Sequence, residues 1–569
     1  MAETNQALAR IFDQMGDALE IKGENVFKIA AYRKVARALR DLPRDAADLA
    51  AEEKLREIPG VGPDIAAKIQ EFLATGKVAA IEREVAALPP GLFDVLRIPD
   101  VGPKTVKLVF EKLGVKTPED FKRALDSGAV AELPGMGEKK VAKILKGMEF
   151  VKKAGERLSI GLALPIAEQI LAALKEVAGV KRIEAAGSLR RWKETVGDLD
   201  FVVATAHPEK VLERFVAIEG VSDVLAHGDT KASVRWDNRL QMDVRVVPEE
   251  SWGAALAYFT GSKEHNVRLR TLSLKQGLSL NEYGFLKGEK RVPIASEEEL
   301  YEKLKMQFVP PELREDSGEI EAALKNKLPH LVELKDIRGD LHVHTRHSDG
   351  LMPVEEVVEH ALDLGYEYIA ITDHSMSAQY AHGIEPERLK EQWKDIEEAQ
   401  KKHPKIRIFK GAEVDIRPDG EPDYPADVLK QLEFVLVAIH QWGSKDVTGR
   451  VVRALSSPHV TCMAHPTGRL IGKREPYSVD LHRVMETAAE KGKWMEINSH
   501  YMRLDLNDAH AREAHKMGIS ICLGTDTHAA GEFANMRYGV HTARRAWLTP
   551  ADILNCLPRK SFEKALVRS

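Results

Sequence analysis

Hydrophobic positions along the first 150 residues recur at the spacing of amphipathic helices. Residues 7–21, 25–42 and 64–76 place apolar side chains three or four positions apart, which predicts helices that each bury one face. Residues 158–315 differ, because short apolar stretches typical of strands alternate there with helical segments. The pattern therefore predicts an all-α N-terminal part followed by an α+β part.

After residue 338, short apolar stretches alternate regularly with helical segments, which is typical of a parallel α/β fold. Seven strands are predicted, which indicates a closed (β/α)7 barrel. They lie at residues 340–345, 368–374, 406–413, 434–440, 460–466, 494–499 and 519–528. The polar, proline-containing stretch before the barrel is predicted to be a linker.

The composition limits the kind of protein. A chain of 569 residues is too long for one hydrophobic core and predicts several domains. It has no run of about 18 apolar residues and no signal-peptide pattern, so we expect a cytoplasmic protein without a membrane span. Three cysteines cannot form a disulfide framework, which suits a reducing compartment. The net charge of −5 gives no general attraction to nucleic acid, so any DNA contact must depend on local geometry.

One motif occurs three times in the helical part, at 58–69, 98–109 and 133–144. Each copy predicts a tight turn that opens a helix, where free backbone N–H groups can bind a phosphate. Residues 1–150 hold 24 basic and 24 acidic side chains, so such turns would bind the DNA backbone without excess positive charge. One copy alone would favour an ordinary helical hairpin, whereas three favour helix-hairpin-helix motifs that bind DNA independently of sequence. The glycines assigned to DNA binding are Gly60, Gly62, Gly102, Gly135 and Gly137.

Three aspartates on two predicted strands form the first candidate site. Asp198 and Asp200 are two residues apart and so face the same side, and Asp243 lies on a strand able to pair beside them. Converging carboxylates repel each other unless cations lie between them, which predicts a nucleotidyltransferase with two Mg²⁺ ions. Gly187 and Ser188 form a turn at a helix start that suits triphosphate oxygens. An Asp-x-Asp alone would favour a solvated strand face, but the third aspartate and this turn favour the catalytic interpretation.

The segment YFTGSKEHNVRLR at 258–270 adds candidate nucleotide contacts. Tyr258 and Phe259 can pack on a sugar ring, and Asn266 and Arg270 can reach base edges in the minor groove. The alternative interpretation is an ordinary aromatic core pair before a helix.

Together these motifs resemble the family X DNA polymerases, similar to polymerase beta, over roughly residues 1–315. The resemblance implies that Asp198, Asp200 and Asp243 hold the catalytic metals. It implies nucleotide contacts at Gly187, Ser188, Arg191, Gly197, Tyr258, Phe259, Gly261, Asn266 and Arg270. In the N-terminal domain it places the 5′-phosphate lyase nucleophile at Lys68, with Lys28 in the matching helix.

The chain departs from this family's pattern at three positions. Gln241 stands two residues before Asp243, where eukaryotic members carry a basic residue. In the lyase pocket, Asp64 stands at a lysine position and Phe27 at a histidine position.

Histidines gather in the last part of the chain, where 16 of the 20 follow residue 338. Many lie with acidic residues at the C-terminal ends of the predicted barrel strands, where barrel enzymes build their active sites. A lone histidine is more often a core or surface residue, but a set that obeys one geometric rule predicts a metal site. The candidate ligands are His342, His344, Asp349, His374, Glu413, His440, His465, Asp526 and His528.

Residues 335–569 resemble the PHP phosphoesterase domain, which bacterial family X polymerases carry at the C-terminus. The resemblance implies three metal ions. They are assigned to His342, His344, Glu413 and Asp526; to Glu413, His440 and His465; and to Asp349, His374 and His528. Mixed histidine and carboxylate ligands suit Mn²⁺ or Zn²⁺. We expect a metal-dependent 3′–5′ exonuclease and, in addition, AP endonuclease activity at abasic sites.

The predicted domains follow from these motifs. They are a 5′-phosphate-binding, lyase-like domain at 1–88, a fingers-type DNA-binding domain at 89–157, a nucleotidyltransferase palm at 158–245, a thumb at 246–315, a linker at 316–337 and a PHP domain at 338–569. We expect a DNA-directed DNA polymerase that fills short gaps in base excision repair. Its expected partners are dNTPs and gapped or primer-template DNA with a 5′-phosphate, and we expect a monomer associated with the bacterial nucleoid.

Two alternatives remain. In one, the chain is a gap-filling polymerase whose barrel is mainly structural, which the full ligand set argues against. In the other, it is a nucleotidyltransferase acting on small molecules, which the three helix-hairpin-helix motifs argue against.

Overall fold

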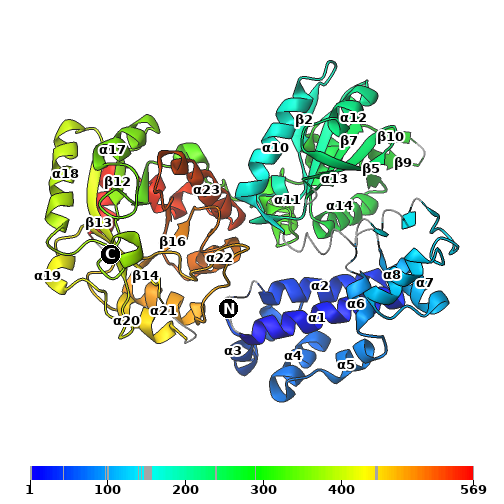
Figure 1. Ribbon diagram of the computed structural model, residues 1–569, viewed down its shortest axis with the longest axis horizontal. Helices are drawn as coiled ribbons and strands as arrows, with labels where there is room; N and C mark the ends of the chain where they lie inside the picture. Colours follow the sequence, from blue (N-terminus) through cyan, green and yellow to red (C-terminus); the bar gives the residue numbers. More distant parts are fainter. Residues whose placement is uncertain are drawn as a thin grey trace. The chain divides into compact units, whose positions relative to one another are not determined.

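A computed structural model describes residues 3–40, 42, 44–96, 98, 101–138, 140–141, 144–145, 157–237, 240–288, 290–441 and 446–567. The chain forms two compact units (Figure 1). The first holds Met1–Arg157 with Gly220–Ala226 and Ser233–Gln241, and the second holds Leu158–Glu219, His227–Ala232 and Met242–Ser569. Among the described residues, every helix is too short or too polar to cross a membrane.

The N-terminal part is helical, as the apolar spacing predicts. Its helices are α1 (Glu3–Lys22), α2 (Val26–Arg40), α3 (Ala46–Ala51), α4 (Pro63–Thr75), α5 (Ala79–Ala86), α6 (Gly91–Leu96), α7 (Pro103–Leu113) and α8 (Pro118–Asp126). They bury two apolar clusters, one around Phe12 and Val35 and the other around Val106 and Phe121. Proline stands first in α4, α7 and α8, where its fixed φ suits a helix start.

The α+β part is built on a five-stranded sheet in the order β2-β4-β7-β6-β5. Its elements are β1 (Leu158–Ser159), α10 (Ile160–Lys175), β2 (Arg182–Ala185), α11 (Gly187–Arg190), β3 (Thr195–Val196), β4 (Asp198–Ala204), α12 (Pro208–Val216), β5 (Val221–His227), β6 (Lys231–Trp236) and β7 (Leu240–Val247). Strand β4 runs antiparallel to β2 and buries Phe201 through Ala204, so only its first residues reach the surface. This arrangement brings the aspartates of β4 to the side of β7.

A smaller subdomain follows the sheet. It comprises α13 (Trp252–Thr260), α14 (Lys263–Lys275), β8 (Ser279–Asn281), β9 (Gly284–Lys287), β10 (Lys290–Val292) and α15 (Glu297–Lys303). The segment that we predict as a linker is folded against this subdomain, because α16 (Glu319–Leu324) buries Ile320 and Ala323 in the same apolar cluster. Glu319 is also fully buried and lies 2.7 Å from Nδ1 of His265.

The C-terminal part is a parallel seven-stranded barrel, which confirms the predicted (β/α)7 architecture. Its strands are β11 (Gly339–Val343), β12 (Tyr368–Ile371), β13 (Arg407–Asp415), β14 (Phe434–Ala438), β15 (Cys462–Met463), β16 (Trp494–Asn498) and β17 (Ile521–Gly524), hydrogen-bonded in that order. Strands β11 and β17 meet through the hydrogen bonds Asp526 N–His342 O and His344 N–Thr527 O, which nearly close the ring.

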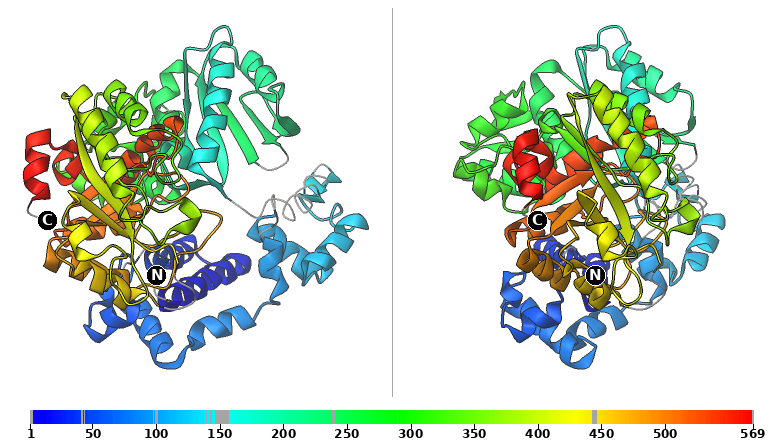
Figure 2. Two further views of the ribbon diagram at one scale, coloured as in Figure 1. Left: turned by 60° about the vertical axis from the view of Figure 1, so that its left-hand side comes forward. Right: turned by 90° about the vertical axis from the view of Figure 1, so that its left-hand side faces the viewer.

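Helices surround this barrel, and their bounds are α17 (Val354–Asp363), α18 (Leu389–Lys402), α19 (Ala426–Leu429), α20 (Thr448–Leu455), α21 (Leu481–Lys491), α22 (Asp508–Lys516), α23 (Met536–Arg545) and α24 (Arg559–Leu566). Branched side chains such as Ile371, Val414 and Ile497 pack outward against these helices. Helix α24, red beside the C-terminus in Figure 2, places Phe562 against Tyr368 and Trp494 at the N-terminal end of the strands. The opposite end stays available for polar side chains.

Candidate active sites

The three predicted aspartates meet at one face of the five-stranded sheet. Asp198 and Asp200 lie on β4 and Asp243 lies on β7, its neighbour in the sheet. Burial, followed by the charges of Asp198 and Asp243, raises the pKa of Asp200 to about 7. The proximity of three carboxylates therefore destabilises the fully charged triad, and a divalent cation would relieve this repulsion. Lys231 of β6, which the sequence interpretation missed, lies 3.1 Å from Asp243 Oδ1.

The Gly-Ser turn at the start of α11 lies against the triad. Gly187 has φ +59°, and a Cβ built there would lie 2.3 Å from Oδ2 of Asp200, so only glycine fits. Oγ of Ser188 is buried and lacks a hydrogen-bond partner among the described residues. An unsatisfied hydroxyl at a helix start beside acidic residues fits the oxygen of a metal–triphosphate ligand.

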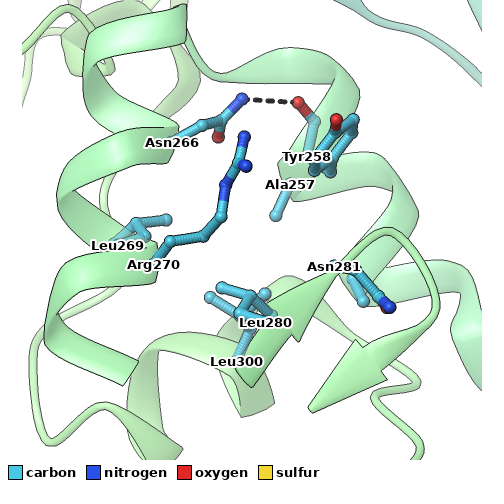
Figure 3. Close-up of a pocket in the computed structure, with 9 residues that line it drawn as sticks. Ala257, Tyr258, Asn266, Leu269, Arg270, Leu280, Asn281 and Leu300 are labelled. Atoms are coloured by element: carbon cyan, nitrogen blue, oxygen red, sulfur yellow. Dashed lines mark hydrogen bonds between the residues drawn. The ribbon is translucent and has the colours of Figure 1, made fainter. Parts of the chain in front are cut away.

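Three of the predicted nucleotide contacts after the triad, Tyr258, Asn266 and Arg270, line one pocket of the smaller subdomain (Figure 3). Asn266 Nδ2 donates to the carbonyl of Tyr258 at 2.7 Å and to that of Gly261 at 3.1 Å. The guanidinium of Arg270 lies 5.6 Å from the Tyr258 ring centroid. Phe259 packs edge-on against Tyr258, and the Arg245 guanidinium lies over the Phe259 ring. The structure thus joins the residues of 258–270 into one polar and aromatic surface.

Two other predicted contacts lie near the triad. Gly197 is exposed and directly precedes Asp198 at the start of β4. Arg191 caps the C-terminal end of α11, where its Nε donates to Glu315 at 3.0 Å and its Nη1 donates to the carbonyl of Thr260 at 2.8 Å.

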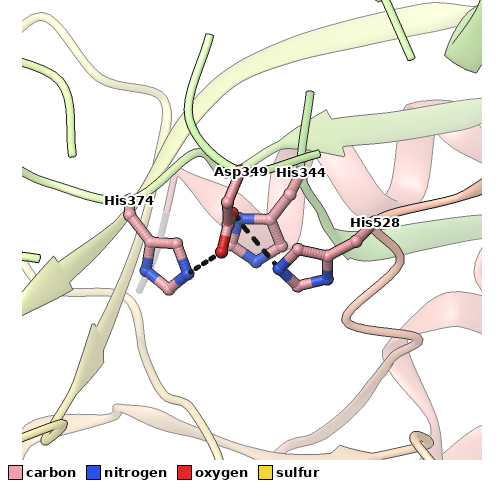
Figure 4. Close-up of side chains that lie close together, drawn as sticks. All are labelled: His344, Asp349, His374 and His528. Atoms are coloured by element: carbon pink, nitrogen blue, oxygen red, sulfur yellow. Dashed lines mark ion pairs between the residues drawn. The ribbon is translucent and has the colours of Figure 1, made fainter. Parts of the chain in front are cut away.

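All nine predicted ligands of the barrel gather at the C-terminal ends of its strands. Glu413 of β13 lies at the centre, within 3.6 Å of His342, His344, His374, His440 and His465. Asp526 Oδ1 lies 3.2 Å from His344 Nε2 and 3.6 Å from His342 Nε2. Figure 4 shows a further group, in which Asp349 faces His344, His374 and His528.

Several ligand atoms in this cluster are buried without a hydrogen-bond partner among the described residues. They include Nε2 of His342 and both ring nitrogens of His344. Unsatisfied buried nitrogens are costly unless a ligand is bound to them, so the donor set fits divalent metal ions. Burial also lowers the pKa of His344 to about 4, which keeps this imidazole in the neutral form that binds metals.

Charges in the cluster depend strongly on one another. Burial alone would raise the pKa of Glu413, but the neighbouring His374, His440 and His342 hold it well below its usual value. Burial lowers the pKa of His440, yet Glu413 and Asp415 together raise it to about 10. Burial also opposes the charged form of His528. Asp349 and Asp526 favour that form and raise the pKa of His528 to about 9. Metal ions would replace these protons.

The structure shows which residues orient the ligands. Glu496 Oε1 lies 2.7 Å from Nδ1 of His342, and its Oε2 accepts from the backbone N–H of His465 at 2.8 Å. Asp415 Oδ1 lies 3.0 Å from Nδ1 of His440. Arg503 Nε lies 3.1 Å from Asp526 Oδ2. Such partners set the tautomer and ring orientation of metal-binding histidines.

Two ligands of this site have a strained backbone conformation. His465 has φ +26° and Asp526 has φ +56°, although neither is glycine. Non-glycine residues at positive φ cost free energy and persist where surrounding contacts hold them. Both residues are held, His465 by Glu496 and Asp526 by the backbone of β11.

Comparisons with known proteins match the same regions. Family models of a helix-hairpin-helix domain match residues 3–78, a SAM-like helix-hairpin-helix tandem 93–149, the DNA polymerase beta thumb 255–315 and the PHP domain 340–500. A Bacillus subtilis (strain 168) protein named DNA polymerase/3′-5′ exonuclease PolX is 36% identical over 99% of this chain and 99% of its own length. The chain belongs to the family X DNA polymerases, in their PolX branch.

The PHP domain of this family X polymerase has relatives of its own. A probable phosphatase of Acetivibrio thermocellus is 30% identical over 34% of the chain and 80% of its own length. A probable phosphatase of Thermoanaerobacter sp. (strain X514) is 25% identical over 38% of the chain and 89% of its own length. Both are much shorter than this chain, so the barrel also occurs without the polymerase part.

The helix-hairpin-helix glycines of the polymerase fall into two groups. Gly60 and Gly135 have positive φ, at +90° and +76°, as tight turns require. Gly62 and Gly102 have φ near −90° and precede the prolines that open α4 and α7. Around Gly62, Gly102, Gly135 and Gly137, the space that a Cβ would occupy is open. Pro99 and Asp100 of the second motif and part of the helix after the third lie outside the described residues.

The lysines predicted for the lyase pocket are placed differently from each other. Lys68 is mostly buried on α4, and its Nζ bonds to Asp64 at 2.5 Å, one turn away. Lys28 is exposed on α2, next to Phe27, whose side chain is 77% exposed. The departure at Asp64 therefore gives Lys68 an acidic partner.

Proposed function

We propose that this chain is a DNA-directed DNA polymerase that fills short gaps during base excision repair and carries a 3′–5′ exonuclease in its PHP domain. The polymerase assignment is carried by the triad of Asp198, Asp200 and Asp243 against the Gly187–Ser188 turn, on a chain that aligns with the Bacillus subtilis protein over nearly its full length. The nuclease assignment is carried by the nine-residue cluster centred on Glu413.

In the polymerase site, the chain's own residues would orient a nucleotide and hold charge. Mg²⁺ ions bound to the three aspartates would neutralise the leaving pyrophosphate and activate the primer hydroxyl. Ser188 Oγ and the N–H groups that open α11 would donate to triphosphate oxygens, while Arg191 supplies positive charge one turn later. Tyr258 would face the sugar, and Asn266 and Arg270 would reach the base edges.

In the PHP domain, the ligands are assigned to three groups that lie close together, and two of these groups share Glu413. Mn²⁺ or Zn²⁺ ions would polarise the scissile phosphodiester as Lewis acids. The residues assigned to them are His342, His344, Glu413 and Asp526; Glu413, His440 and His465; and Asp349, His374 and His528. The ring partners Glu496 and Asp415 would hold His342 and His440 in the tautomer whose metal-facing nitrogen can bind an ion. The same chemistry would cleave at abasic sites.

Incubation with a gapped duplex, dNTPs and either Mg²⁺ or Mn²⁺ tests both assignments. Primer extension together with primer shortening in the absence of dNTPs supports the proposal. Extension without shortening supports a mainly structural PHP domain, and the absence of both reactions with every metal contradicts the polymerase and the nuclease.

A second proposal concerns the N-terminal domain, where Lys28 and Lys68 would favour gaps with a 5′-phosphate because a dianion gains charge-assisted hydrogen bonds. The expected preference is about tenfold in filling rate over a 5′-hydroxyl gap, the gain from one such bond. Equal filling rates contradict it. Schiff-base chemistry at Lys68 is tested separately by borohydride trapping on a deoxyribose phosphate substrate, and trapping that survives Lys68→Ala assigns the lyase to another residue.

A further inference from the structure

One arginine of the PHP domain contacts Arg191 at the end of the Gly187–Ser188 turn and helix of the palm. Arg545, at the end of α23, donates from Nη1 to the carbonyl oxygen of Arg191 at 2.7 Å. The same Nη1 lies 3.3 Å from Oε1 of Glu315, and this oxygen also accepts from Arg191 Nε at 3.0 Å. One guanidinium from the barrel therefore touches both members of the Arg191–Glu315 pair.

Arg545 is itself held firmly. Its side chain is 6% exposed, and its Nη2 lies 2.6 Å from Oδ2 of Asp508 in the first turn of α22. Burial opposes its charge, but Asp508 and Glu315 raise the pKa of Arg545 above its ordinary value, so the guanidinium stays protonated. A buried charge of this kind is stable only when its partners are in place.

Other contacts hold the same stretch of the palm against the barrel. The Trp192 ring stacks on His541 of α23 with centroids 3.5 Å apart and planes 4° apart. Arg469 forms a fork with the Glu194 carboxylate at 3.2 and 2.7 Å. Residues 191–194 are thus fixed by three PHP side chains, directly after the helix that bears Ser188.

Glu315 makes the arrangement relevant to nucleotide affinity. Burial raises its pKa, but Lys193, Arg545 and Arg191 lower it to about 2, so its carboxylate is charged at neutral pH. This carboxylate competes with a triphosphate for the guanidinium of Arg191. Arg545 is a second buried cation beside Glu315. Because the Glu315 carboxylate interacts with both guanidinium groups, its attraction for Arg191 is weaker than it would be without Arg545.

We propose that Arg545 of the PHP domain is a positioning residue for the polymerase reaction, which adjusts Arg191 and its turn for binding the nucleotide triphosphate. This inference rests on the polymerase function proposed above. It predicts that loss of Arg545 weakens dNTP binding, because Glu315 then neutralises Arg191 alone and the Arg191 carbonyl loses its buried donor.

The test compares steady-state gap filling by the full-length wild-type protein and by Arg545→Met over a range of dNTP concentrations. The KM for dNTP should rise about tenfold, the effect of one charge-assisted hydrogen bond, while kcat changes less than about twofold. Arg545→Lys should recover part of the affinity, since it restores the charge beside Glu315 but not the fork. Primer degradation without dNTPs should be unchanged, because the hydrogen-bond and ion-pair partners of Arg545 among the described residues are Arg191, Glu312, Glu315 and Asp508, none of which is a ligand of the metal cluster.

Arg537→Met is the matched control. Arg537 lies on the same helix and also reaches the palm, where Nη1 bonds to Glu168 of α10 at 3.2 Å. Among the described residues its hydrogen-bond and ion-pair partners are Glu168 and Tyr538, neither of which belongs to residues 187–194. Its variant should keep the wild-type KM. Asp508→Asn, which conserves side-chain volume and weakens the hold on Arg545, should raise the KM in the same direction as Arg545→Met.

Four possible results distinguish failure of the inference on Arg545 from failure of the proposed polymerase function. An unchanged KM in both Arg545→Met and Asp508→Asn overturns the inference. A parallel loss of kcat, exonuclease activity and melting temperature shows a merely structural role and also overturns it. An equal rise in KM for Arg537→Met shows that general domain docking, not Arg545, is responsible. Failure of the wild-type protein to incorporate any dNTP instead contradicts the proposed polymerase function.

Discussion

The palm and the PHP domain hold metal ligands in two different ways. The palm presents three carboxylates at a partly exposed sheet face, and one of them, Asp200, has a pKa near neutrality. The PHP domain presents nine ligands from strands all around a barrel. Four of its ligand histidines, His342, His344, His374 and His465, are buried, and partners such as Glu496 and Asp415 orient the rings. The difference indicates that the palm site is completed by its metal–nucleotide substrate, whereas the PHP site is preorganised for resident metals.

The largest effect is expected from Glu413→Ala. This change removes the carboxylate that contacts five histidines and leaves the cations without their shared anion. Exonuclease activity should fall on the order of 10,000-fold, which corresponds to the loss of several kcal/mol of transition-state stabilisation. The metal content of the protein should fall as well. The barrel should stay folded, since the ligands lie at its mouth.

Metal analysis and a primer-degradation assay without dNTPs measure this outcome. Incorporation by the palm should persist. Undiminished digestion places the nuclease outside this cluster, and joint loss of digestion and incorporation favours a structural role for the barrel.

Asp200→Ala should have the opposite effect on the two activities, because it should impair nucleotide incorporation and leave primer digestion intact. It removes one carboxylate of the palm triad, so single-nucleotide incorporation should fall about 1000-fold or more. The protein should remain folded, because the change also removes repulsion among Asp198, Asp200 and Asp243. Primer digestion and DNA binding measured on the same preparation should match the wild type. Incorporation at the wild-type rate shows that the triad is wrongly assigned.

A smaller effect is expected from Glu496→Gln in the PHP domain. The amide preserves the shape but no longer favours the His342 tautomer that leaves Nε2 free for metal. Loss of a partner of this kind typically weakens metal binding about 10- to 100-fold. Metal titration of the exonuclease measures the shift, and a wild-type titration curve contradicts preorganisation of this ligand.

The smallest effect is a difference in pH dependence between the two sites. Asp200, with its pKa raised to about 7, must lose a proton to bind Mg²⁺, so metal affinity in the palm should drop about tenfold per pH unit below 7 and level off above it. In the PHP domain, metals must displace protons from His440 and His528, whose pKa values are about 10 and 9. Metal affinity there should keep rising up to about pH 10.

The same raised pKa of Asp200 has a consequence for stability without metal. Folding favours the protonated form of Asp200. Its contribution to the free energy of unfolding is therefore fully present below the ordinary pKa of an aspartate and is lost as pH rises through about 7. Metal concentrations for half-maximal incorporation and half-maximal digestion, measured from pH 6 to 9, compare the two sites. Parallel curves would remove the distinction between them.

Local sequence patterns predict much of both sites for physical reasons. Two aspartates two residues apart on a strand must share a face, and ligands at the ends of parallel strands must meet at one end of a barrel. Asp198, Asp200 and the nine PHP ligands lie together as these rules require. The domain boundaries and the roles of individual site residues stay predictions that the proposed experiments address.

The sequence by itself determined the helical N-terminal part, the seven-stranded barrel and the residue types that gather at each site, because hydrophobic period and strand-end position are local properties of the chain. Only the tertiary structure decided which distant residues became partners. Lys231 beside Asp243, Glu496 behind His342 and Arg545 on the Arg191–Glu315 pair are separated by 12 to 354 positions in the chain, and no local pattern connects them. Long-range packing selects such pairs, since a buried charge is tolerated only where the fold brings a partner to it.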